Sequence, residues 1–192
     1  MKAFFDIDTQ IDFVYPAGAL YGKGAERVLP AVAKLNHYAA AQGHRLFSST
    51  CAHPENAAEF RVWPPHCVVG TAGQQKPLST LIANRLTVPN LLLHAAPLET
   101  GQILIEKDDL DVFTNPNMEP LLDAYGIDEC FVYGVFTEYC VKCAIMGLLT
   151  RGRKVSLIFE ATAHLDAAAG DRVLHHFVQA GGHITSVSQV TL

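Results

Sequence analysis

Six short apolar runs recur along the chain, each bounded by turn or helix signals. They are nearly continuous and rich in aromatic and β-branched residues, which is typical of strands buried on both faces of a parallel sheet. In chain order the runs are KAFFDI (2–7), HRLFSS (44–49), QILIEK (102–107), CFVYGV (130–135), KVSLIF (154–159) and HITSVS (183–188). The pattern therefore predicts six strands.

Helical patterns lie between most of these runs. The clearest repeats apolar residues at spacings of three and four from Val28 to Ala39 and ends at Gly43, the residue type favoured after a helix. Three more cover 117–125, 138–150 and 167–180. Alternating strands and helices predict an α/β fold with a doubly wound, mostly parallel six-stranded Rossmann-like sheet and helices on both faces. A length of 192 residues predicts a single domain over 1–192.

The stretch from about 53 to 101 breaks this alternation. It holds six of the ten prolines and shows no clean period. Long irregular stretches inside a compact domain are commonly functional. We therefore predict a proline-rich flap, inserted into the domain at about 53–101 and made mostly of loops, with one short helix near 78–86.

Composition and charge exclude several classes of protein. Hydrophobic residues make up 49% of the chain and charged residues 17%, so the chain is not of the disordered type. The net charge is −5 and no run of Lys or Arg occurs, which argues against nucleic acid or an anionic membrane as partner. The sequence has no apolar run of 18 residues, so no membrane-spanning helix is predicted. Five cysteines without an export signal indicate free thiols in a reducing, cytoplasmic setting.

Chemically useful side chains follow the predicted strands. Asp8 comes after the first strand, Cys51 and His53 after the second, Lys107 closes the third, and Cys140 follows the fourth. In open parallel sheets, binding sites form beyond the carboxyl ends of the strands. We therefore expect an acid, a base and a thiol to converge at one edge of the sheet.

Cys140 lies in GVFTEYCVKCA, where a strand turns into an amphipathic helix. Backbone N–H groups and the helix dipole at such a position favour a thiolate and an oxyanion, which predicts a lowered pKa and a nucleophile. The alternatives are a buried structural cysteine, or a dithiol with Cys143 in the Cys-x-x-Cys spacing. Asp8 and Lys107, each taken alone, read as a turn carboxylate and a solvated lysine. Their joint placement with Cys140 favours catalysis.

A second group of polar residues brackets the flap. His53 and His66 stand with Cys51 and Glu59 nearby, and imidazole, thiolate and carboxylate are all ligands for zinc or a similar divalent ion. Spacing alone leaves open that both histidines are ordinary buried polar residues. Trp63, in WPPHC, is either a core anchor or the wall of an aromatic pocket.

Taken together, these segments resemble a known family. DIDTQIDF is similar to the D-x-Q-x-D-F signature of the isochorismatase-like cysteine hydrolases, EKDDLDVF to their K-x-x-x-x-x-F segment, and GVFTEYCVKCA to their G-V-x-T-x-x-C-V element. WPPHCVVGTAG resembles the W-P-x-H-C-x-x-G-T-x-G segment of nicotinamidases and pyrazinamidases. The motifs occur in the family's order and cover most of the chain.

The resemblance implies an activity: hydrolysis of a small amide through a thioester, with nicotinamide giving nicotinate and ammonia. It implies Asp8, Lys107 and Cys140 as the catalytic triad. It also implies a cis peptide bond before Phe136, whose N–H forms an oxyanion hole with that of Cys140.

The resemblance further implies how the substrate is held. Phe13 and Trp63 would enclose the pyridine ring, and a divalent metal, expected to be zinc, would bind the ring nitrogen. The flap departs from the family at two positions, where Cys51 replaces a metal-binding Asp and Glu59 stands in place of a His. Here the candidate metal ligands are Cys51, His53, Glu59 and His66.

Other functions stay open at this point. One alternative is a metal-free hydrolase of the same superfamily that acts on another small amide or carbamoyl compound. A dithiol oxidoreductase and a non-catalytic binding domain are the alternatives from other classes. The expected partner is a small-molecule amide, with no nucleic acid and no membrane. A homo-oligomer stays open, because relatives often assemble as oligomers.

Overall fold

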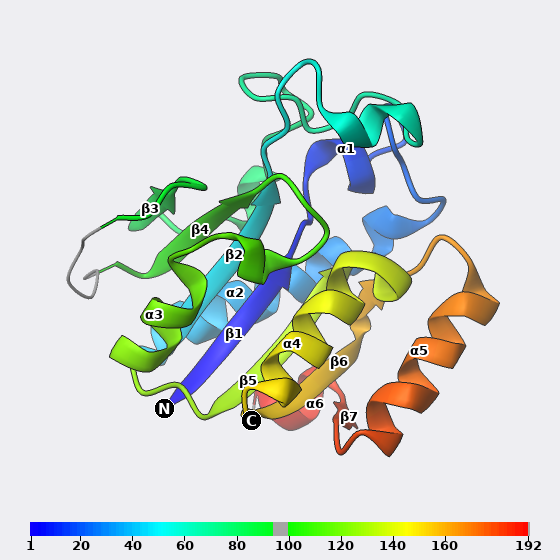
Figure 1. The fold of residues 1–192 in the computed structure, drawn as a ribbon. Helices are drawn as coiled ribbons and strands as arrows, with labels where there is room; N and C mark the ends of the chain where they lie inside the picture. The colour runs from blue at the N-terminus through cyan, green and yellow to red at the C-terminus, as the bar shows by residue number, and fades with distance from the viewer. Residues whose placement is uncertain (94–99, 192) are drawn as a thin grey trace.

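The structure, a computed structural model, describes residues 1–93 and 100–191. Their strands form a seven-stranded sheet in the order β3-β4-β2-β1-β5-β6-β7, and every neighbouring pair is parallel (Figure 1). The strands are β1 Lys2–Ile7, β2 Arg45–Cys51, β3 Arg85–Val88, β4 Gln102–Lys107, β5 Glu129–Val135, β6 Lys154–Ala163 and β7 His183–Thr185. The predicted class of fold is therefore confirmed.

Helices cover both faces of this sheet. The α-helices are α1 Ile11–Val14, α2 Leu29–Ala41, α3 Met118–Ala124, α4 Lys142–Thr150, α5 Ala167–Gln179 and α6 Val187–Val190. Short 3-10 turns are η1 Ala25–Val28, η2 Ala58–Arg61, η3 Leu78–Thr80 and η4 Val112–Thr114, and a π-helical turn, η5, spans Thr137–Val141. Figure 1 shows α3, α4 and α5 on one face and α2 on the other.

Two apolar cores form, one on each face. Successive side chains of a strand point to opposite faces, so β1 contributes Phe5 to the core under α3, α4 and α5, and Phe4 to the core under α2. The central strands β1, β2 and β5 are buried over nearly their whole length. This double burial is why their sequences are continuous apolar runs, as the hydrophobic pattern predicted.

The expectation of six strands is wrong by one. The additional strand, β3, lies inside the predicted flap and pairs with β4 at the edge of the sheet. Its sequence is RLTV, and three of its four residues are exposed, so it carries no apolar run. The short helix expected near 78–86 is only the turn η3. Positions 94–99 of the predicted flap lie outside the described residues.

The described part of the flap is tied to the turn that follows β1. The Asp12 carboxylate accepts a hydrogen bond from the Cys67 N–H at 2.7 Å, and the Gln10 side chain donates one to the Gln74 carbonyl, also at 2.7 Å. A Cβ at Gly73 would lie 2.1 Å from the Asp12 carboxylate, so only glycine allows this approach. Figure 1 shows the flap above the carboxyl ends of the central strands. Among the described residues, no helix has the length and apolarity to cross a membrane.

Candidate active site

Four side chains singled out from the sequence meet at the carboxyl edge of the sheet. Asp8 follows β1, Cys51 ends β2, Lys107 ends β4, and Cys140 lies in η5 after β5. The order of the strands reverses between β1 and β5, which is where ligands bind in doubly wound sheets. The topology alone thus brings a carboxylate, an ammonium and two thiols together.

A buried ion pair forms the centre of this group. Lys107 Nζ lies 2.8 Å from Asp8 Oδ2, and both side chains are inaccessible to solvent. Burial alone would raise the pKa of Asp8, but the Lys107 charge and hydrogen bonds from Lys107, Ser49 and Cys140 hold it below its ordinary value. Burial would lower the pKa of Lys107, and Asp8 instead raises it well above the usual range. Both groups are therefore charged at neutral pH.

Two contacts that the sequence did not predict fix this pair. The Ser49 hydroxyl donates to Asp8 Oδ1 at 2.7 Å, and Lys107 Nζ donates to the Asp109 carbonyl at 2.8 Å. Asp8 also adopts a left-handed backbone conformation, with φ of 48°. Such a conformation is uncommon for a residue other than glycine and occurs frequently at functional sites. Strand register places Ser49 beside Asp8, and the sequence does not reveal register.

Both thiols lie against the same ammonium. Lys107 Nζ is 3.2 Å from the Cys51 sulfur and 3.7 Å from the Cys140 sulfur. Cys51 is the strand neighbour of Lys107 in the β2–β4 ladder, and this register directs its side chain to the lysine. The Cys51 sulfur also lies 3.7 Å from Asp8 Oδ2.

The expected lowering of the Cys140 pKa is not what the structure gives. Its hydrogen bond with Cys51, followed by burial, raises the pKa of the Cys140 thiol well above its ordinary value. The same hydrogen bond lowers the pKa of Cys51. Two adjacent thiols beside one ammonium titrate as a pair, because ionising one disfavours ionising the other. Cys140 is thus a neutral thiol that needs a base before it can attack.

The backbone before Cys140 has unusual geometry. The peptide bond between Val135 and Phe136 is cis, as the resemblance implied. Gly134 has φ of 120°, and a Cβ there would lie 2.1 Å from the Ile7 carbonyl oxygen. Only glycine therefore lets β5 lie this close to the end of β1, where Asp8 follows.

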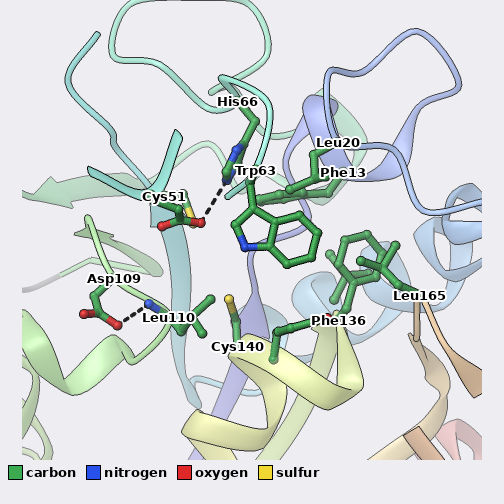
Figure 2. A pocket seen from close by; sticks show the side chains of 13 residues that line it. Phe13, Leu20, Cys51, Trp63, His66, Asp109, Leu110, Phe136, Cys140 and Leu165 are labelled. Carbon is green, nitrogen blue, oxygen red and sulfur yellow. Dashed lines mark hydrogen bonds and ion pairs between the residues drawn. The ribbon is translucent and has the colours of Figure 1, made fainter. Parts of the chain in front are cut away.

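A largely apolar cavity opens above the two thiols. Figure 2 shows the Trp63 indole at its centre, between His66 and Cys140. The residues lining it are Phe13, Leu20, Cys51, Glu59, Trp63, His66, Asp109, Leu110, Val135, Phe136, Tyr139, Cys140 and Leu165. Phe13 and Trp63 were singled out from the sequence. Leu20, Tyr139 and Leu165 were missed, because nothing in the pattern sets them apart from core residues.

A second polar cluster adjoins this cavity, and two of its three members, Glu59 and His66, line it. Glu59 approaches His53 Nε2 at 3.7 Å and His66 Nε2 at 3.5 Å, and one ligand atom from each residue lies within 4.8 Å of the others. Within the described part of the chain, neither ring nitrogen of the buried His53 has a hydrogen-bond partner. Two imidazoles and a carboxylate fit a zinc site with one open position.

Electrostatics couples the members of this cluster. The hydrogen bond from His66 holds the pKa of Glu59 below its ordinary value. Burial would lower the pKa of His66, but Glu59 raises it overall. Cys51, a predicted ligand, is not brought into this three-residue group, because its sulfur points to Lys107 and Asp8.

A partly open cavity over a carboxylate, an ammonium and a thiol, at the carboxyl edge of a parallel sheet, is the arrangement of an α/β enzyme of hydrolytic type. The Isochorismatase domain model matches residues 2–189, so the chain belongs to the isochorismatase family. It is similar to the nicotinamidase of Saccharomyces cerevisiae, with 23% identity over 84% of this chain and 88% of the relative. The nicotinamidase of Escherichia coli is 24% identical over 93% of this chain and 90% of the relative.

Solved structures show the same fold. A pyrazinamidase of Pyrococcus horikoshii in complex with zinc superposes with a TM-score of 0.81 at 24% identity, covering 96% of this chain and 98% of that one. A nicotinamidase of Bacillus subtilis gives a TM-score of 0.82 at 22% identity, covering 96% and 99%. The family resemblance predicted from the motifs is confirmed.

Proposed function

We propose that the protein is a cysteine amidohydrolase that converts nicotinamide to nicotinate and ammonia. One observation carries the proposal: Asp8, Lys107 and Cys140 meet beneath an aromatic cavity that Glu59 and His66 line, with His53 beside them. The first group supplies a base and a nucleophile. The second group offers ligands for a divalent metal that would bind the ring nitrogen of the substrate. Similarity to nicotinamidases over most of the chain supports this choice of substrate.

In the first half of the reaction, Asp8 accepts the Cys140 proton while the sulfur attacks the amide carbonyl carbon. Lys107 keeps Asp8 ionised and ready to accept that proton. The backbone N–H groups of Phe136 and Cys140 stabilise the oxyanion, and an interaction of this kind contributes about 2.7 to 4 kcal/mol per donor. Asp8 then returns the proton to the amide nitrogen, ammonia leaves, and the acyl group remains on sulfur as a thioester.

In the second half, Asp8 takes a proton from water as the water oxygen attacks the thioester carbonyl. The carbon–sulfur bond breaks, nicotinate is released, and Cys140 regains its proton. The neutral state of the Cys140 thiol fits this cycle, because both half-reactions then use the same carboxylate as base and acid.

The cavity supplies binding and orientation. Phe13 and Trp63 lie in its wall and would hold the flat ring by apolar contact. His53, Glu59 and His66 would hold a divalent metal such as zinc, which when bound acts as a Lewis acid toward the pyridine nitrogen. Burial of Asp8 and Lys107 excludes bulk water from the reacting atoms.

The test is ammonia release from nicotinamide by the purified protein, with and without a chelator, beside Cys140→Ala. We expect turnover by the unmodified protein, none by Cys140→Ala, and loss on chelation that returns with zinc. Cys143→Ala is the matched control, because Cys143 lies one helical turn further on and does not line the cavity. Turnover by Cys140→Ala would contradict the proposal. If nicotinamide is not hydrolysed but another small amide is, and a chelator does not affect that activity, the metal-free alternative is favoured.

A further inference from the structure

The cavity contains a second cysteine that the proposed reaction does not use. Cys51 and Cys140 both line it (Figure 2), and Lys107 Nζ lies within 3.7 Å of both sulfur atoms. Cys51 ends β2, and Cys140 lies in the turn that follows β5. The strands β2 and β5 are the two neighbours of β1 in the sheet. The proximity of two sulfur atoms at a candidate catalytic centre calls for a chemical explanation.

We propose that Cys51 and Cys140 are oxidised reversibly to an intramolecular disulfide. Geometry carries this inference, because Lys107 Nζ contacts both sulfur atoms, at 3.2 Å and 3.7 Å. An ammonium between two thiols stabilises negative charge on whichever sulfur reacts first. The bond itself is independent of the proposed function, and only its effect on turnover depends on that function.

The other three cysteines are placed differently. Cys67 contacts the Gly73 carbonyl at 3.9 Å, Cys130 is buried in the core, and Cys143 is half-buried on α4. None of them lines the cavity. Among the five thiols, all of which lie in the described part of the chain, Cys51 and Cys140 therefore form the pair that shares both a small-molecule pocket and a cation.

A peroxide such as hydrogen peroxide is the oxidant this step requires. The sulfur that reacts first gives up its proton and attacks one peroxide oxygen, the O–O bond breaks, and the departing hydroxide takes up that proton to become water, leaving a sulfenic acid. The second sulfur, losing its proton, attacks the sulfenic sulfur. The S–O bond breaks, a second water leaves, and the S–S bond forms. Two thiols lose two electrons in total, and one peroxide is reduced to two waters.

The disulfide would have two consequences. It removes the Cys140 nucleophile, so turnover stops while the bond persists. It also halts oxidation at a stage that a thiol reductant reverses, whereas a lone sulfenic acid proceeds to the irreversible sulfinic acid. Cys51 would thus convert permanent oxidative damage to Cys140 into a reversible off state.

The experiment treats the purified protein with hydrogen peroxide, blocks the remaining thiols, and maps the sulfur bonds by mass spectrometry. Digestion after Lys, Arg and Glu separates the relevant cysteines into the segments 46–55, 130–138, 139–142 and 143–151. We expect a cross-link between 46–55 and 139–142, a loss of two thiols per chain, and recovery of both thiols with a reductant. Cys143→Ser should give the same cross-link.

Cys51→Ser provides the decisive comparison. In that variant we expect no cross-link and sulfinic acid on Cys140, with no recovery on reduction. Cys51→Ala serves as a second variant, and circular dichroism checks that each remains folded. Absence of the 46–55 to 139–142 cross-link in the unmodified protein, or pairing of Cys140 with Cys143, would overturn the proposal. A cross-link in a protein that leaves nicotinamide intact would uphold this inference while refuting the proposed function.

Discussion

Two buried carboxylate–lysine pairs come from neighbouring positions at the end of β1. Asp6 pairs with Lys76 at 3.1 Å, and Asp8 pairs with Lys107 at 2.8 Å. All four side chains are almost completely buried. By distance and burial the two pairs are alike, so these properties alone do not distinguish a structural pair from a catalytic one.

Their surroundings differ. Asp6 also accepts hydrogen bonds from Thr9 at 2.7 Å and from Asn36 at 3.0 Å, groups that neither attack carbonyl carbon nor face the cavity. Asp8 instead has two thiols within reach and lies beneath that cavity. A buried ion pair with inert neighbours has a structural role only, because removing one partner leaves the other charge buried and uncompensated. It becomes a candidate for catalysis where a nucleophile and a pocket adjoin it.

The strongest way to break this comparison is to neutralise each carboxylate in turn. Asp6→Asn and Asp8→Asn should both destabilise the fold by about 3 to 5 kcal/mol, because each leaves a buried lysine without its counter-charge. Only Asp8→Asn should also lower kcat, by about 10² to 10⁴, since a positioned acid or base contributes that much. Denaturant unfolding and ammonia release, measured well below the unfolding temperature, check both effects. Equal losses of kcat in the two variants would remove the distinction.

The dependence of folding stability on acidic pH gives a second test of the Asp8–Lys107 pair. The pKa of Asp8 is lower in the folded chain than its ordinary value of 3.8, so its ionised form stabilises the fold. That contribution is fully present above this value and is lost as pH falls through the lower, folded pKa. The stability difference between the unmodified protein and Asp8→Asn should therefore shrink below pH 3.8. Denaturation midpoints measured down through this range test it, and a constant difference would contradict the ion-pair account.

Two adjacent serines provide the smallest and most closely matched test. Ser49 donates to Asp8 at 2.7 Å and Ser48 to Asp6 at 3.4 Å, from opposite faces of β2. Removing a hydrogen bond to a charged group costs about 1.5 to 3 kcal/mol, which sets the upper limit for each alanine variant.

Only Ser49→Ala should change the reaction, by raising the pKa of Asp8 and moving the acidic limb of the pH–rate profile upward. Ser48→Ala should leave that profile in place. An unchanged profile in Ser49→Ala would show that Ser49 acts on stability alone.

The strands could be predicted from the sequence where they are buried on both faces of the sheet, because such strands consist of a continuous run of apolar residues. β3 could not, because an exposed edge strand of four residues carries no such pattern. The turn after β5 was predicted as the start of a helix, and the structure has the π-helical η5 there before α4. Local backbone geometry of this kind depends on packing against elements distant in the chain, here α5, which the sequence does not display.

The convergence of Asp8, Lys107 and Cys140 followed from strand order, because parallel strands end at one edge. The position of Cys51 did not follow from it. Spacing grouped Cys51 with His53, but the register between β2 and β4 turns its sulfur to Lys107. The pKa prediction for Cys140 was wrong for the same reason, since it took no account of a neighbouring thiol.

The central claim, an acyl group carried on Cys140, is tested most directly by partitioning the intermediate. Hydroxylamine is added to reactions of nicotinamide and of methyl nicotinate, and the ratio of nicotinohydroxamate to nicotinate is measured for each. A common thioester must partition identically, so the account predicts one ratio from both substrates and no product of either kind with Cys140→Ala. A ratio that depends on the leaving group, or nicotinate formed with no hydroxamate at all, would contradict it.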